Sequence, residues 1–140
     1  MAQGKTIKTV LVTDDDATLR TITVKLIEAR GHRVLTADSG ERAIEVFKAV
    51  TPIDLLVLDL IMTGMDGLET MAQLRELGFG EVPVVVLTAK ASDENILDGY
   101  RAGAGYYLTK PFKPAALINI VDYLIGDLSA GEREQLALRL

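Results

Sequence analysis

The stretch TVLVTDDDATLRTITVKLIEARG, residues 9–31, decides the fold class because its hydrophobic period changes halfway through. Its first five residues are apolar or β-branched and indicate a buried strand. After three aspartates, apolar residues recur at helical spacing, and Gly31 is placed to end the helix in a left-handed conformation. The inward face expected for this helix carries Leu19, Ile22, Leu26 and Ile27. A strand followed directly by an amphipathic helix predicts a β–α unit.

The same order of strand and helix continues along the chain. Apolar runs of strand length lie at residues 33–37 (RVLTA), 54–60 (DLLVLDL), 82–89 (VPVVVLTA) and 106–111 (YYLTKP). Helices are expected to begin at Ser39–Gly40 and near Asp66, Ser92 and Pro114. Near-continuous valine and leucine strands between amphipathic helices predict a parallel sheet that is covered on both faces. We therefore expect an α/β, flavodoxin-like three-layer sandwich with a five-stranded sheet in the order 2-1-3-4-5 and five helices.

Composition narrows the class of protein. The 140 residues are 49% hydrophobic and 25% charged, which predicts one globular domain. No apolar run is long enough for a membrane span or a signal peptide, so we expect a cytoplasmic protein with no membrane contact. The chain has no cysteine, which excludes disulfides and thiolate metal sites. A net charge of −5 argues against direct contact with nucleic acid.

Polar residues stand where the central strands are expected to end. These residues are Asp14, Asp15, Asp59, Thr88 and Lys110. The carboxyl ends of parallel strands lie on one edge of the sheet, so the five side chains are expected to converge at the topological switch point. Each one has an ordinary structural interpretation when taken alone, such as strand propensity for Thr88 or a surface position for Lys110. Asp59 is the exception, because any apolar residue would be buried there at lower cost.

This grouping favours phosphoryl chemistry. Clustered carboxylates repel one another, a divalent cation relieves the repulsion, and ligands that are all oxygen atoms select Mg²⁺ over zinc or copper. Thr88 and Lys110 can donate to the oxygens of a phosphoryl group. A carboxylate facing that group can attack it and become an acyl phosphate. The residues therefore predict an aspartyl-phosphate site.

Two families with that chemistry are candidates. The segment DDDAT resembles the D-x-D-x-T box of haloacid dehalogenase-like phosphatases, in which Asp14 would be the nucleophile and Asp16 the general acid. That resemblance leaves Asp59 without a role, and the late acids Asp122 and Asp127 lie in a segment with helical spacing. We expect Asp16 instead to cap the helix that follows it. A third class, flavodoxin-type cofactor binders, is disfavoured because three aspartates would repel the phosphate of FMN.

From about Lys8 to Gly126 the chain resembles the receiver domain of two-component response regulators. The resemblance rests on DDD, LLVLDLIMTGMDGLE, VVVLTAK and GAGYYLTKPF, in that order and spacing. It implies that Asp59 accepts a phosphoryl group from a phosphohistidine on a histidine kinase or phosphotransfer protein. It implies as well that Mg²⁺ is bound by Asp15 and Asp59, by Asp14 largely through water, and by the backbone carbonyl of Ile61. Lys110 would pair with Asp59 and then with the phosphoryl oxygens, and Lys110–Pro111 is expected to be a cis peptide.

The resemblance also implies a switch. Thr88 would move toward the phosphoryl group and Tyr107 would rotate inward behind it. The surface that changes would consist of the helix that begins near Ser92, the strand at 106–111 and the helix that begins at Pro114. The first of these helices has few apolar residues, and Gly99 in its middle costs about 1 kcal/mol relative to alanine, so it is easily shifted. Thr63 departs from the family pattern because it stands where proline is usual, and we expect a less rigid loop there.

The limits of the domain and its partners complete the expectations. Residues 1–128 are assigned to the receiver domain, and residues 129–140 to a C-terminal helical tail or the start of a linker, with Ser129 and Glu132 capping a short helix. The chain is expected to act on a downstream protein target, or to be the receiver piece of a longer transcriptional regulator. The very apolar helix that begins at Pro114 makes a homodimer through the switch surface a further expectation.

Overall fold

Five parallel strands form one sheet in the computed structural model, which describes residues 6–50, 52–89 and 93–140. The strands are β1 (Thr9–Thr13), β2 (Arg33–Ala37), β3 (Leu55–Leu58), β4 (Val84–Thr88) and β5 (Tyr106–Thr109). Their spatial order is β2-β1-β3-β4-β5, with every neighbouring pair parallel. The predicted strand order and fold class are therefore confirmed. The last three strands are shorter than predicted, because their terminal residues turn into the loops.

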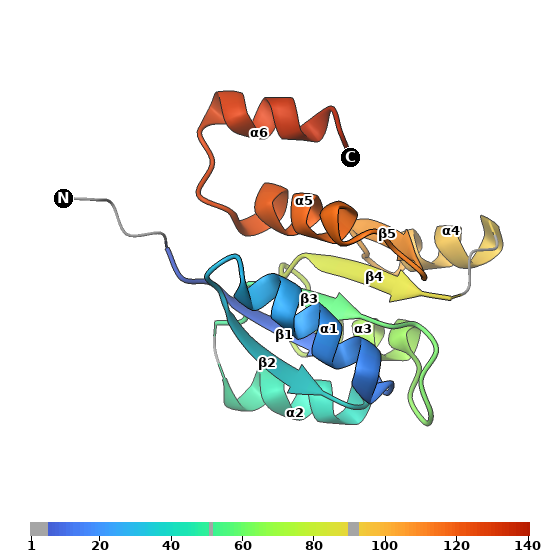
Figure 1. The fold of residues 1–140 in the computed structure, drawn as a ribbon. Coiled ribbons are helices and arrows are strands. Elements are labelled where there is room, and N and C mark those ends of the chain that lie inside the picture. The colour runs from blue at the N-terminus through green and yellow to red at the C-terminus, as the bar shows by residue number, and fades with distance from the viewer. Residues whose placement is uncertain (1–5, 51, 90–92) are drawn as a thin grey trace.

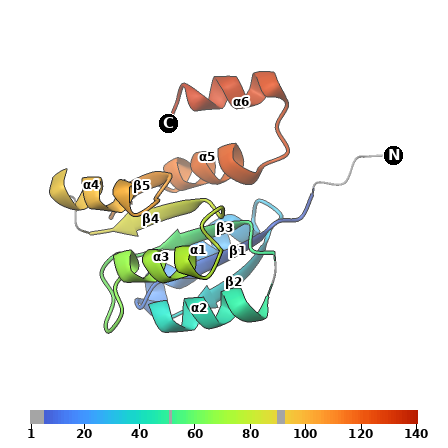
Figure 2. The ribbon, with the colours of Figure 1, turned by 180° about the vertical axis from the view of Figure 1, so that it is seen from behind.

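In the described residues, six helices connect and flank the strands. They are α1 (Ala17–Glu28), α2 (Gly40–Ala49), α3 (Gly67–Glu76), α4 (Asp93–Arg101), α5 (Pro114–Ile125) and α6 (Ala130–Ala137). In Figure 1 helix α1 lies in front of the sheet, and in Figure 2, from behind, α2 and α3 cover the opposite face. The expected start near Ser92 falls outside the described residues. Within the described part of the chain, no helix is long and apolar enough to cross a membrane.

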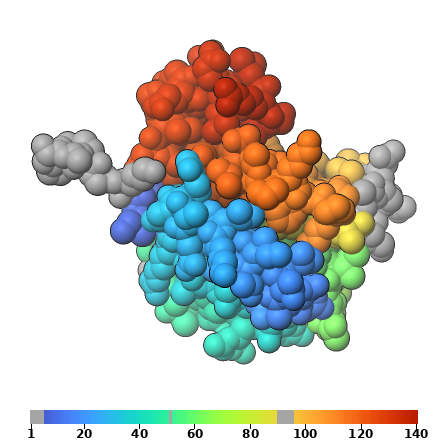
Figure 3. Space-filling view, in the orientation of Figure 1, coloured from blue at the N-terminus to red at the C-terminus, as the bar shows by residue number. Residues whose placement is uncertain are grey.

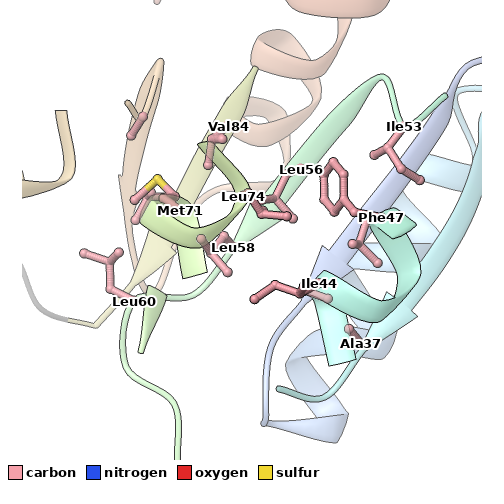
Figure 4. Packing of buried hydrophobic residues seen from close by; sticks show 14 of the residues in the cluster. Ala37, Ile44, Phe47, Ile53, Leu56, Leu58, Leu60, Met71, Leu74 and Val84 are labelled. Carbon is pink, nitrogen blue, oxygen red and sulfur yellow. The ribbon is translucent and has the colours of Figure 1, made fainter. Parts of the chain in front are cut away.

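The two faces of the sheet bury separate cores because side chains alternate along each strand. Leu11, Leu56 and Val86 point toward α2 and α3, where Phe47, Met71 and other apolar side chains pack against them (Figure 4). The neighbouring positions in the strands, such as Val10, Val57 and Val85, point to the other face and pack against α1 and α5. Burial on both faces explains why these strands are apolar without interruption.

Helix ends follow the local signals in the sequence. Asp16, Ser39 and Asp66 are the N-caps of α1, α2 and α3, and each side chain accepts a hydrogen bond from a backbone N–H in the first turn. Gly31 follows α1 with φ of 89°, as its position predicts. One prediction for α1 is wrong, because Ile22 is 47% exposed while Thr23 is buried in its place. Thr23 can be buried because its hydroxyl donates to the carbonyl of Leu19.

Helix α6 extends the fold beyond the sheet. In Figure 3 the C-terminal residues, in red, form a rounded projection that continues from α5. A capping box between Ser129 and Glu132 begins the helix, as the sequence predicts. The Arg133 guanidinium donates to the carbonyls of Tyr123 and Gly126 and lies 5.5 Å from the centre of the Tyr123 ring. These contacts hold α6 on the C-terminal end of α5.

Candidate functional site

Backbone pairing continues past the ends of the strands and positions the polar residues of the site. The N–H of Asp14 donates to the carbonyl of Ala37 at 3.1 Å, and the N–H of Asp59 donates to the carbonyl of Thr13 at 3.0 Å. At the other side of the switch point, the N–H of Lys110 donates to the carbonyl of Thr88 at 2.8 Å. These bonds place the residues at one edge of the sheet, which confirms their predicted convergence for Asp14, Asp59 and Lys110.

Three carboxylates meet at this edge. Asp14, Asp15 and Asp59 each offer an oxygen atom, and these atoms lie within 4.8 Å of one another. Asp14 is 3% and Asp59 is 7% exposed, whereas Asp15 is open to solvent. A compact set of carboxylate oxygens, two of them buried, fits a hard divalent cation better than a soft one. The arrangement therefore suits a metal ion of the magnesium class.

Lys110 neutralises part of this negative charge. Its ammonium nitrogen lies 2.7 Å from Asp14 Oδ2 and 3.2 Å from Asp59 Oδ2. The peptide bond between Lys110 and Pro111 is cis, as expected. One cation thus bridges the two buried acids, and the ammonium group is close enough to contact any group attached to Asp59.

The pKa values reflect these surroundings. Burial raises the pKa of Asp59, and the negative charge of Asp14 adds to this, although the Ile61 N–H and Lys110 oppose it. Burial alone would lower the pKa of Lys110, but the hydrogen bond to Asp14 and the charges of Asp59 and Asp14 outweigh it and raise that pKa. Lys110 is therefore charged at neutral pH, and a second cation beside Asp59 would favour the charged form of its carboxyl group.

The three consecutive aspartates have different partners. Asp14 accepts the Asp16 N–H through Oδ1 at 2.9 Å, and its own carbonyl accepts from Arg20 at 2.6 Å. Asp16 uses its carboxylate to accept the Leu19 N–H at 3.0 Å. Asp16 is thus a helix cap, as predicted, and not a second acid directed at the site.

Two residues of the short loop between β3 and α3 donate hydrogen bonds to the acids of the site. The Ile61 N–H donates to Asp59 Oδ1 at 3.1 Å. Two residues further on, the Thr63 N–H and hydroxyl lie 3.2 Å and 3.4 Å from Asp15 Oδ2. The expectation of a less rigid loop at Thr63 stays a prediction, and the structure adds that Thr63 makes two contacts with Asp15. Sequence reasoning missed this role, since it considered only the proline that Thr63 replaces.

The proposed switch residues lie on β4 and β5. Thr88 is completely buried at the end of β4, and Tyr107 is half-buried on β5. Burial and the charge of Asp59 raise the pKa of Tyr107. Its ring lies against Gly99 of α4, where an added Cβ would come within 3.1 Å of the ring, and its centre is 6.4 Å from that of Tyr100. The ring of Tyr107 therefore has direct contact with α4.

Gly67 is a second residue that the sequence analysis missed. The first residue of α3 lies so close to the phosphoacceptor candidate that a Cβ on Gly67 would be 2.6 Å from the Asp59 carbonyl oxygen and 2.7 Å from Leu60 Cα. Its N–H donates to the Leu60 carbonyl at 2.9 Å. The glycine directly after the capping Asp66 was the available signal, because only glycine allows such a close approach of two backbones.

Comparison with known proteins gives the family of the chain. The family model described as the response regulator receiver domain matches residues 10–122. The chain belongs to the response regulator receiver family. The match includes both buried acids and Lys110 and ends within α5, so α6 lies outside it.

Curated relatives of this receiver are longer regulators. YvrH of Bacillus subtilis (strain 168), named as a transcriptional regulatory protein, is 40% identical over 109 residues, or 77% of this chain and 45% of the relative. PhoB of Pseudomonas aeruginosa, a phosphate regulon transcriptional regulatory protein, is 33% identical over 91% of this chain and 56% of its own length. The chain therefore spans about half the length of these relatives.

Solved structures match the receiver over nearly their full length. The Vibrio cholerae chemotaxis protein CheY4 aligns with a TM-score of 0.79 and 27% identity, covering 85% of this chain and 99% of CheY4. The receiver domain of Francisella response regulator 1452 aligns with a TM-score of 0.78 and 32% identity, covering 84% of this chain and 96% of that domain. The family match and the capping role of Asp16 leave the phosphatase alternative without support.

Proposed function

We propose that this receiver accepts one phosphoryl group on Asp59 and thereby switches the surface formed by α4, β5 and α5. The observation that carries the proposal is the bridge from Lys110 to Asp14 and Asp59, because it joins a buried carboxylate to a cation and a second acid at the switch point of the sheet. In this role the chain is a phosphoacceptor and not a turnover enzyme.

The residues divide the transfer among them. An oxygen of Asp59 attacks the phosphorus atom, the bond from phosphorus to the histidine nitrogen of the donor breaks, and its electron pair stays on the imidazole, which is then protonated. The Lys110 ammonium pairs with the phosphoryl oxygens, and the Thr88 hydroxyl donates to one of them. Asp14 and Asp15, together with Asp59 and the Ile61 carbonyl, would hold Mg²⁺. When bound, Mg²⁺ offsets the negative charge that gathers around the transferred group.

The switch depends on the contact of Tyr107 with α4. If Thr88 moves toward the phosphoryl group, space opens behind it, and Tyr107 can move inward and away from Gly99. Helix α4 then loses a contact that holds it on β5. A small differential contact of this kind is enough to shift a helix between two populated positions.

The partners follow from the family and from exposed residues. A histidine kinase or histidine phosphotransfer protein in the cytoplasm would supply the phosphoryl group, and a downstream protein target or an attached output domain would read the switch. Leu97 and Tyr100 on α4 are exposed apolar residues on the proposed switch surface, which is suited to a homodimer or a protein target. We assign the receiver domain to residues 1–128, and residues 129–140 to a tail or the start of a linker.

Acetyl phosphate with Mg²⁺ tests the phosphoacceptor. Intact-mass measurement should show one added phosphoryl group on the wild type and none on Asp59→Asn. Asp54→Asn is the matched control, because Asp54 precedes the same strand at its other end, where its carboxylate accepts the Thr9 N–H at 2.8 Å. That variant should be labelled like the wild type. Label on Asp14, or repeated turnover of a phosphomonoester, would instead support the phosphatase.

A further inference from the structure

Thr63 links the two loops that carry the acids of the candidate metal site. Asp15 lies between β1 and α1, and Thr63 lies in the loop between β3 and α3, 48 residues later. The backbone N–H and the hydroxyl of Thr63 both reach Asp15 Oδ2, at 3.2 Å and 3.4 Å. Within the described part of the chain, the hydrogen bonds to the Asp15 carboxylate come from Thr63.

Asp15 needs such a partner more than the other two acids do. Asp14 and Asp59 are buried and share the Lys110 ammonium, whereas Asp15 is exposed. Three neighbouring negative charges repel one another, and an exposed aspartate can relieve the repulsion by rotating into water. The donors of Thr63 oppose that rotation. The Asp15 carboxylate is consequently held in the group of oxygens that lie within 4.8 Å of one another.

The contact with Thr63 uses only one oxygen of the Asp15 carboxylate. Both donors of Thr63 contact the same oxygen of Asp15, Oδ2, and neither of them donates to Oδ1. A carboxylate that binds Mg²⁺ through one oxygen can keep a hydrogen bond on the other. The contact with Thr63 is therefore compatible with metal binding and reduces the ordering that binding requires.

We propose that Thr63 is the positioning residue for Asp15, so that this receiver holds its exposed metal-binding acid in place before Mg²⁺ arrives. The inference rests on the proposed metal site and adds to it a residue that acts through Asp15 and does not itself ligate. A proline at position 63 would have neither a backbone N–H nor a hydroxyl and could make neither contact.

Magnesium titration of four variants tests the inference. Calorimetric titration with Mg²⁺ alone should give equal dissociation constants for the wild type and Thr63→Ser, which retains both donors. Thr63→Val keeps only the N–H and should bind about 2-fold more weakly, and Thr63→Pro should bind ~3- to 10-fold more weakly, because Mg²⁺ binding must then also order the Asp15 side chain. Thr21→Val is the matched control, because the Thr21 hydroxyl is exposed on α1 and donates only locally, to the Ala17 carbonyl.

The outcomes separate this inference from the proposed function. Failure of the wild type to bind Mg²⁺ would refute the metal site itself. Binding by the wild type with an equal constant for Thr63→Val and Thr63→Pro would refute only the role of Thr63, and so would tighter binding by either variant. Thermal unfolding in Mg²⁺-free buffer shows that each variant is folded. If Thr63→Pro does not fold, the comparison of Thr63→Val with Thr63→Ser decides.

Discussion

At Asp59 the chain places a carboxylate where an aliphatic side chain would be buried at lower cost. Isolated burial of a charge is unfavourable by several kcal/mol, and Lys110 and the Ile61 N–H offset part of that cost (~1.5–3 kcal/mol for a hydrogen bond to a charged group). A divalent cation beside Asp59 and Asp14 would relieve the repulsion that remains between their negative charges. We therefore expect the proposed phosphoacceptor role of Asp59 to be accompanied by a local cost in stability.

Gly67 packs closely against the backbone of Asp59 and Leu60, and its substitution should strongly destabilise the fold. Gly67→Ala places a methyl group within 3 Å of the backbone at Asp59 and Leu60, which cannot move without displacing β3 or α3. We expect a loss of about 2–3 kcal/mol in the free energy of unfolding, measured by urea denaturation. Gly131→Ala is the control, because nothing lies within 4 Å of its added Cβ, and it should change the free energy by less than ~0.5 kcal/mol. Similar losses in the two variants would contradict the close approach of α3.

At the scale of elements, α6 depends on α5 more than on its own sequence. It has eight residues, and isolated helices of fewer than about 12 residues are marginal in water. The Ser129–Glu132 capping box begins the helix, but Arg133 makes the contacts that hold it on α5. Those contacts occupy carbonyls at the C-terminal end of α5, which carry partial negative charge.

Arg133→Ala should therefore release α6 without unfolding the sheet. Hydrogen exchange should show that the amides of residues 130–137 lose protection. The free energy of unfolding of the remaining domain, which consists of the sheet and α1 to α5, should fall by less than about 1 kcal/mol. Arg139→Ala, on the last turn that follows the same helix, should leave the exchange of α6 unchanged. Retained protection of α6 in Arg133→Ala would mean that apolar contacts alone hold the helix.

At the scale of the whole molecule, a cation at the switch point should stabilise the fold. Mg²⁺ that binds the native state at ten times its dissociation constant adds ~1.4 kcal/mol, which raises Tm by several degrees. The increment should be smaller at about pH 5 than at about pH 7.5, because the pKa of Asp59 is raised and protons then compete with the cation. Thermal unfolding with and without Mg²⁺ measures the increment. Asp59→Asn should reduce it and Asp54→Asn should retain it, and equal increments in both would place the cation elsewhere.

Much of this architecture could be predicted because local rules decide it. The alternating cores on two faces follow from strands that are apolar at every position, and the helix starts at Ser39 and Asp66 follow from capping residues. The convergence of Asp14, Asp59 and Lys110 followed from the common edge of parallel strands. Ile22 was wrongly placed because helical spacing does not say which of two adjacent positions a neighbouring helix will cover.

The sequence by itself determined the helices and strands, their order in the sheet and the edge at which the acids gather. Hydrophobic periodicity and the right-handedness of crossover connections decide these features, and both depend on residues that are close together in the sequence. Only the tertiary structure decided that Thr63 holds Asp15, that α3 leaves no room for a side chain at Gly67, and that Arg133 fastens α6 to α5. These contacts join side chains to backbone groups across loops and helix ends. Their geometry depends on atomic distances that residue type and spacing do not specify.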